Sequence, residues 1–232
     1  MKFQNYRKYL TLALVVFLLA SGLQVFTPPQ AARADTTTGL IAYYPFENNA
    51  NDSSGNGYHG TATNVTYGAG PVGQAAYFNN TSSRIEVASL ANHLPGGNSA
   101  RSVSFWMYRD PAATDDGNMV SWGSNAATGT RFSPLHAPDG SLYVIGAGYD
   151  RDSGYDLPYS TWEHVVVTYD GANLRFYVNG TPYSTVVAGA YNTDASQMLR
   201  IGVSVFGADT EWFGGSLDEV RIYDRALAPL DI

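Results

Sequence analysis

Residues 162–187 read WEHVVVTYDGANLRFYVNGTPYSTVV, and this stretch decides the fold class. Three runs of β-branched and aromatic residues are separated by Asp170-Gly171 and by Asn179-Gly180. Asn-Gly or Asp-Gly between alternating residues is the strongest short signal for a β-hairpin, because the tight turn needs positive φ at its centre. The stretch therefore predicts three consecutive antiparallel strands.

Short apolar runs bounded by turn residues continue on both sides of this meander. Further strands are expected at residues 40–46, 75–79, 84–87, 101–108, 118–122, 130–135, 141–145, 198–203 and 213–223. We expect residues 75–79 and 84–87 to pair as a hairpin, and Pro138-Asp139-Gly140 to turn another. Roughly twelve short strands without a long amphipathic helix predict an all-β fold, a two-sheet antiparallel sandwich.

The first 34 residues have the pattern of an export signal. A positively charged start precedes the apolar run of residues 10–20, which is too short for an ordinary membrane span, and small residues lead to Ala34. We expect cleavage near Ala34, a single domain over residues 35–232, and a secreted or periplasmic location.

Composition narrows the class of partner. The chain has no cysteine, which excludes disulfides and cysteine-ligated zinc. From residue 35 onward it carries 9 arginines and no lysine against 20 acidic residues, a net charge of −11. Nucleic acid and anionic membranes are therefore unfavourable partners, whereas cations and neutral polar ligands are favourable ones. No membrane insertion is predicted, and a monomer is the default expectation.

Asp218 lies in the last predicted strand, within FGGSLDEVRIYDRAL at residues 213–227. It shares parity with Val220 and Ile222, so strict alternation places its carboxylate on the apolar face. A buried, unpaired carboxylate costs several kcal/mol, so an arginine, backbone donors or a metal ion should meet it. The loop at residues 47–60, rich in Asn, Asp, Ser and Gly, offers oxygen ligands for such a metal.

Calcium suits this combination, because it accepts six to eight hard oxygen ligands, including backbone carbonyls. The candidate ligands are Glu47, Asp52, Asn56, the carbonyl of Gly57, and Asp218. His59 is a poorer calcium ligand and is expected to orient the loop. In the alternative interpretation, Asp52, Ser53 and Asn56 form local Asx and Ser turns, and Asp218 pairs with an arginine.

A second candidate site is the segment at residues 146–161, GAGYDRDSGYDLPYST, which has no strand periodicity. Aromatic rings can stack on the apolar faces of sugars while polar side chains hold the hydroxyls. The candidate ligand-binding residues are Tyr149, Arg151, Asp152, Tyr155 and Tyr159, with Trp212 before the last strand. Alternatively, these residues cap the ends of the sandwich. Trp106 and Trp162 are expected to pack within sheets.

Catalysis has little support in the sequence. A retaining glycosidase needs two carboxyl groups about 5 to 5.5 Å apart, whereas Asp218 and Glu219 are consecutive and should point to opposite faces of a strand. His93, His136 and His164 show neither H-E-x-x-H spacing nor a serine elbow nearby. A non-catalytic protein is therefore predicted.

Three segments carry a family resemblance: residues 39–62, GLIAYYPFENNANDSSGNGYHGTA, residues 162–180, and residues 213–227. In this order they resemble laminin-G-like domains of the concanavalin A-like lectin and glucanase superfamily. The resemblance implies a jelly-roll sandwich used as an extracellular carbohydrate-binding or adhesive module, often with a calcium ion, here at Asp52 and Asp218. It names no ligand, because the scaffold hosts lectins, adhesion domains and enzymes.

The resulting prediction is a secreted, non-catalytic module that binds a glycan or a glycosylated surface and holds a structural calcium ion. The alternative is a structural or protein-interaction domain of the cell surface that binds no glycan. A third class, a glycoside hydrolase or polysaccharide lyase, would need a close pair of carboxylates on a concave face.

Overall fold

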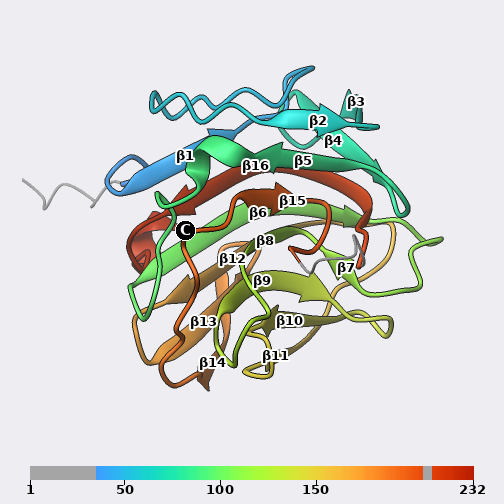
Figure 1. The fold of residues 1–232 in the computed structure, drawn as a ribbon. Helices are drawn as coiled ribbons and strands as arrows, with labels where there is room; N and C mark the ends of the chain where they lie inside the picture. The colour runs from blue at the N-terminus through green and yellow to red at the C-terminus, as the bar shows by residue number, and fades with distance from the viewer. Residues whose placement is uncertain (1–34, 206–210) are drawn as a thin grey trace, which may run out of the picture. The chain divides into compact units, whose positions relative to one another are not determined.

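A computed structural model describes residues 35–205 and 211–232 (Figure 1). The predicted export signal, residues 1–34, lies outside this range, and no helix within it is long and apolar enough to cross a membrane. The strands are β1 (Leu40–Tyr44), β2 (Thr61–Thr63), β3 (Thr66–Ala69), β4 (Gln74–Asn79), β5 (Arg84–Val87), β6 (Arg101–Arg109), β7 (Gly117–Asn118), β8 (Val120–Gly123), β9 (Arg131–His136), β10 (Ser141–Ile145), β11 (Arg151–Asp156), β12 (Trp162–Tyr169), β13 (Asn173–Val178), β14 (Thr181–Val187), β15 (Leu199–Ile201) and β16 (Gly214–Tyr223). Two 3₁₀ turns, Ala88–Leu90 and Pro229–Asp231, complete the described elements.

The strands form two antiparallel sheets of eight strands each, which confirms the predicted sandwich (Figure 1). The first sheet has the order β14-β13-β12-β6-β16-β4-β3, and β1 also pairs with β16. The second has the order β11-β10-β9-β8-β15-β5-β2, with β7 beside β9. The predicted meander is confirmed, since β12, β13 and β14 pair in sequence, as is the hairpin of β9 and β10.

The predicted hairpin of residues 75–79 and 84–87 is wrong. β4 pairs with β3 and β16 in the first sheet, whereas β5 pairs with β2 and β15 in the second. Asn79 explains the difference, because its Oδ1 accepts hydrogen bonds from the backbone N–H groups of Thr81, Ser82 and Ser83. This side-chain-stabilised turn carries the chain across the sandwich.

The core lies between the sheets and follows strand alternation. Val103, Phe105 and Met107 of β6 are fully buried there, and residues in the same phase of β12 join them. Trp122 is also fully buried, and its indole N–H donates to the Pro95 carbonyl at 3.1 Å. The other phase of these strands points away from the second sheet. We call this side of the first sheet the outer face.

A β-bulge interrupts β16 and corrects the expected facing of Asp218. Leu217 lies opposite Met107 on the core side, so Asp218, opposite Trp106, lies on the outer face. The register then shifts at Glu219, whose φ of 55° is left-handed, and Val220 returns to the core. Strict period-two alternation fails here because the bulge inserts one extra residue.

The bulge lies where two strands share one edge of β16. β4 pairs with residues 214–217, and β1 pairs with residues 220–223. The first and last strands are therefore neighbours, as expected. Hydrogen bonds join the adjoining segments too, since Asp35 donates its backbone N–H to Asp231 Oδ1 at 3.0 Å.

Candidate functional site

Asp218 lies at the seam between β1 and β4, on the outer face of β16. Its side chain is fully buried, and Oδ2 accepts a hydrogen bond from the Val72 N–H at 3.1 Å, whereas Oδ1 has no hydrogen-bond partner within residues 35–205 and 211–232. Burial raises the pKa of Asp218 to about 6, and the negative charges of Glu219 and Glu47 act in the same direction. A cation beside Oδ1 would offset the burial and the two neighbouring negative charges, and would favour the ionised carboxylate of Asp218.

Glu47, which is exposed, comes to the same seam from the end of β1. Its Oε1 accepts a hydrogen bond from the Gln74 N–H at 3.2 Å. Two glycines make this approach possible, since a Cβ on Gly73 would overlap Glu47 Oε1, and one on Gly70 would lie 2.6 Å from Asp218 Oδ2. The turn at residues 70–73 is thus folded against two carboxylates from distant parts of the chain.

Asp52 is in a different situation. Its Oδ1 accepts the backbone N–H groups of Tyr43 and Ser54 at 3.0 and 2.8 Å, and its Oδ2 accepts the Ser54 hydroxyl and the Tyr58 N–H, both at 2.9 Å. Burial opposes ionisation, but these hydrogen bonds prevail and lower the pKa of Asp52. His59 orients the loop as expected, because its Nδ1 accepts the Asp52 N–H at 3.1 Å.

The rest of the loop at residues 47–60 is also tied to β1. Asn56 Nδ2 donates to the carbonyls of Ile41 and Leu40, at 2.9 and 3.2 Å, and Gly57 occupies a left-handed conformation at φ 79°. The loop matches the Asx- and Ser-turn alternative in these contacts. The structure brings Glu47 to Asp218, and no described interaction brings the Asp52 carboxylate there. No cluster of three or more His, Asp or Glu side chains suited to a metal occurs within residues 35–205 and 211–232.

The segment at residues 146–161 is not a loop throughout, because β11 within it pairs with β10. The Tyr149 ring lies under the Arg151 guanidinium at 4.4 Å and meets the Tyr191 ring edge-on at 5.9 Å. Arg151 Nη2 also donates to the Ala188 carbonyl at 2.9 Å. These two residues therefore join β11 to the segment that follows β14, closing one side of the sandwich.

Tyr155 and Tyr159 lie in separate environments. The Tyr155 hydroxyl donates to Glu163 Oε2 at 3.1 Å, and its ring packs edge-on against Tyr183 at 4.8 Å. Tyr159 is exposed and lies 4.0 Å from the Arg109 guanidinium. Each ring therefore has a local packing partner, as the capping alternative expects.

The remaining predicted ligand residues are Asp152 and Trp212. Asp152 is exposed, and its Oδ1 accepts the Gly154 N–H at 2.8 Å in a local turn. Trp212 is half-buried just before β16. No described contact gathers the six residues proposed from sequence into one surface.

Sequence reasoning missed an aromatic surface on the outer face. Trp106 of β6 packs against His164 of β12 with ring centroids 5.2 Å apart, and Tyr108 packs against Trp162 at 5.6 Å. Trp106 and Trp162 therefore pack within the first sheet, as expected, but all four residues are only half-buried. The signal was available, because all four alternate with the core positions of their strands. We call these four residues the aromatic strip.

An arginine pocket lies farther along the same face. Arg221 stacks over the Tyr43 ring at 4.1 Å and forms an ion pair with Glu219, which also accepts the Tyr43 hydroxyl at 2.7 Å. Hydroxyl and amide groups of the neighbouring loops complete the lining, among them Ser54 and Asn56. Glu219 therefore reaches the outer face as Asp218 does, and the expectation that they point to opposite faces is wrong. The bulge is again the cause.

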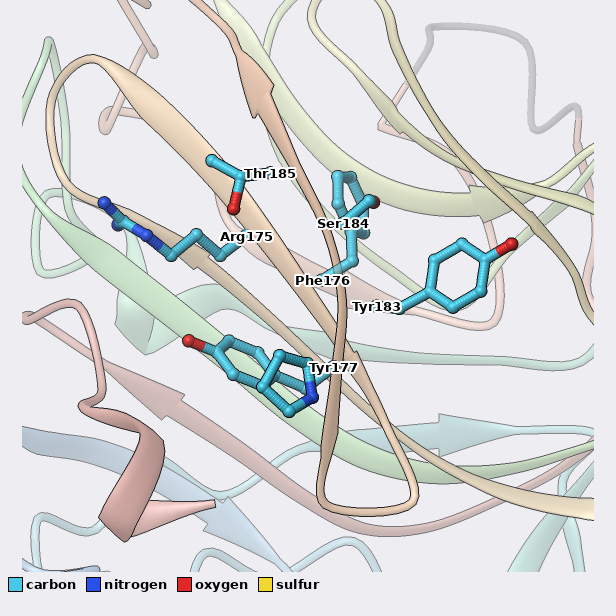
Figure 2. Close-up of a pocket in the computed structure, with 7 residues that line it drawn as sticks. Arg175, Phe176, Tyr177, Tyr183, Ser184 and Thr185 are labelled. Carbon is cyan, nitrogen blue, oxygen red and sulfur yellow. The ribbon is translucent and has the colours of Figure 1, made fainter.

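A shallower pocket lies on the hairpin of β13 and β14 (Figure 2). Arg175 and Thr185 are cross-strand partners there, as are Tyr177 and Pro182. Figure 2 shows Tyr183 turned away from Tyr177, so the two rings do not form one platform. This pocket offers fewer converging polar groups than the arginine pocket.

Comparison with known proteins fits this architecture. Residues 79–232 match the model of a laminin-G-type family described as the concanavalin A-like lectin/glucanases superfamily. The chain belongs to the concanavalin A-like lectin/glucanases superfamily. The family resemblance found in the sequence is thereby confirmed, whereas a search of curated proteins gave no match.

Among solved structures of this superfamily's fold, one similar chain is domain 4 of AbnA, a GH43 extracellular arabinanase from Geobacillus stearothermophilus, in complex with arabinotriose. It is 26% identical, with a TM-score of 0.66, and the match covers 83% of this chain and 95% of that one. The binding domains of Paraclostridial Mosquitocidal Protein 1 and of botulinum neurotoxin serotype D match with 17% and 13% identity and TM-scores of 0.62 and 0.61. Both matches cover 84% of this chain and only about half of the toxin domain, 51% and 50%, so they support the fold alone.

Proposed function

We propose that this chain is an exported, non-catalytic carbohydrate-binding module with a structural calcium ion. The observation that supports carbohydrate binding is the likeness to AbnA domain 4, which extends over 95% of that domain and whose structure contains arabinotriose. Export rests on the charged and apolar pattern of the first 34 residues.

The carboxylates of β16 support a non-catalytic role, even though two of them share the outer face. Asp218 is fully buried and cannot reach a sugar. Glu219 is nearly buried, and its two oxygens are held by Tyr43 and Arg221. Glycoside hydrolysis needs both an acid and a nucleophile or base in contact with the glycosidic bond. Neither residue is free to serve in these roles.

Calcium is proposed at the seam, with Asp218 and Glu47 as its carboxylate ligands. The fit rests on the unpartnered Asp218 Oδ1 and on the two glycines that let residues 70–73 approach both carboxylates. Asp52 and Asn56 are engaged within their own loop, so they are left out of this ligand set. A bound ion would neutralise two carboxylates and join β1 to β16.

Isothermal titration of the exported chain with neutral arabino-oligosaccharides, in calcium and in chelator, tests the binding proposal. We expect saturable binding with no release of reducing ends during prolonged incubation. If neither these nor a wider panel of neutral and acidic glycans bind, the chain is not a carbohydrate module, and the protein-interaction alternative gains support. Release of reducing ends would contradict the non-catalytic role.

A further inference from the structure

The C-terminal segment covers one half of the outer face. The Ser102 hydroxyl donates to the Arg225 carbonyl at 2.8 Å and accepts the Leu227 N–H at 2.9 Å. Beneath this segment Val166 and Tyr223 belong to a small buried apolar cluster, separate from the main core. This half of the face is therefore closed by the chain itself.

The aromatic strip lies on the other half, toward the end of β6 and the start of β12. Trp106 and Tyr108 are two residues apart on β6, and each has its aromatic partner directly across on β12. Alternate residues on one strand are about 7 Å apart, so the strip offers two neighbouring ring pairs. The rings keep part of their surface exposed to solvent. A position that only faced water would be served as well by a polar side chain, so exposed neighbouring rings indicate a binding surface.

Polar groups adjoin the rings. His164 Nε2 lies 3.0 Å from the Ser104 hydroxyl, within hydrogen-bond distance. Burial lowers the pKa of His164, and the positive charge of Arg221 acts in the same direction. Both effects favour the neutral imidazole, which can act as a hydrogen-bonding group.

We propose that the aromatic strip is a binding platform for a neutral glycan chain, which would lie across β6 and β12. This inference rests on the proposed function and assigns it to a surface. Rings of this kind stack against the C–H faces of sugars, while the half-buried His164 can exchange hydrogen bonds with sugar hydroxyls.

Charge decides between a neutral and an acidic glycan. Arg221, the cation that acts on His164, is ion-paired with Glu219. The chain from residue 35 onward carries a net charge of −11. An acidic sugar would meet this net negative charge while Arg221 is already engaged by Glu219, so the platform favours neutral chains.

The test compares Trp106→Ala and Trp162→Ala with Tyr183→Ala, which removes an exposed ring from β14, two strands away from β12. Each is titrated with neutral arabino-oligosaccharides and with acidic oligogalacturonate, and unfolding curves establish that each variant is folded. We expect both tryptophan variants to lose at least tenfold in affinity for the neutral probe and Tyr183→Ala to change less than twofold. Trp106→Phe and Trp162→Phe, which keep a ring, should retain most of the binding.

The outcomes separate the two proposals. Neutral-glycan binding that survives in Trp106→Ala and Trp162→Ala overturns the platform and leaves the carbohydrate-binding function standing. Tighter binding of the acidic probe by the wild-type chain overturns the neutral ligand class. If the wild-type chain binds neither these probes nor the wider glycan panel, the platform and the proposed function both fail.

Discussion

Asp52 and Asp218 are two buried aspartates, expected as ligands of one ion, that the fold treats in opposite ways. Asp52 accepts four hydrogen bonds from its own loop and β1, and its pKa is lowered. Asp218 accepts a hydrogen bond from the Val72 N–H at Oδ2, its Oδ1 has no partner among the described residues, and its pKa is raised to about 6. The first carboxylate organises a loop, whereas the second is the one to which we assign the proposed calcium ion.

The largest effect is expected for Asp52→Ala. The change leaves the N–H groups of Tyr43, Ser54 and Tyr58 without their acceptor, and each unsatisfied buried group costs roughly 1 to 3 kcal/mol. We expect the free energy of unfolding in urea to fall by about 3 kcal/mol. Ser53→Ala, next in the chain, is the matched control and should change it by less than about 0.5 kcal/mol. Equal losses in both variants would contradict the role given to Asp52.

The second-largest effect is expected from added calcium, which should stabilise variants of Asp52 but not variants of Asp218. At a concentration 100 times its dissociation constant, an ion that binds only the folded state adds about 2.7 kcal/mol. The melting temperature should therefore rise with calcium in the wild-type chain and in Asp52→Asn, and should not rise in Asp218→Asn. A full calcium response in Asp218→Asn would remove Asp218 from the site.

Dependence on pH sharpens the contrast, because the two shifts have opposite signs. In chelator at pH 7.5, Asp218→Asn should be more stable than wild type by about 1 to 2 kcal/mol, since it removes a buried charge. This advantage should shrink as the pH falls from about 6 to 3.8, where the folded wild type takes up a proton before the unfolded chain does. For Asp52, whose pKa is lowered, the wild type should instead lose stability relative to Asp52→Asn as the pH falls below 3.8. If the stability difference between wild type and Asp218→Asn followed pH in the same way as that between wild type and Asp52→Asn, the contrast between the two aspartates would be refuted.

Asn56→Ala should have the smallest effect. Its side chain is exposed and donates two hydrogen bonds to β1 carbonyls that solvent could also satisfy. We expect a loss of less than about 1 kcal/mol in urea unfolding and an unchanged calcium response. A lost calcium response would return Asn56 to the ligand set.

Local signals in the sequence were reliable, and those that depend on strand partners were not. The Asn179-Gly180 turn correctly predicted the pairing of β13 and β14. The Asn- and Ser-rich composition of residues 47–60 suggested local Asx and Ser turns as one of two interpretations, and the structure contains such turns. The facing of Asp218 could not be derived, because the bulge at Glu219 exists where β4 gives way to β1 along β16. That junction joins segments far apart in the chain.

The aromatic strip was missed for a related reason. Trp106 alternates with core positions, so its phase on β6 was readable from the sequence. Which half of the outer face the C-terminal segment covers, however, depends on the contacts of Arg225 and Leu227 with Ser102. Without that information, a tryptophan on the outer face could equally lie beneath another part of the chain.

The position of β16 also has a consequence for the order of folding. This strand, formed by residues 214–223, lies inside the first sheet, with β6 on one side and β1 and β4 on the other. The ribosome must therefore complete residue 223 before these strands can acquire their shared neighbour. Such distant pairings make folding slow, commonly milliseconds to seconds. The first sheet is thus completed only after β16 has been synthesised, and until then β1, β4 and β6 present unpaired edges that a cell must keep from associating.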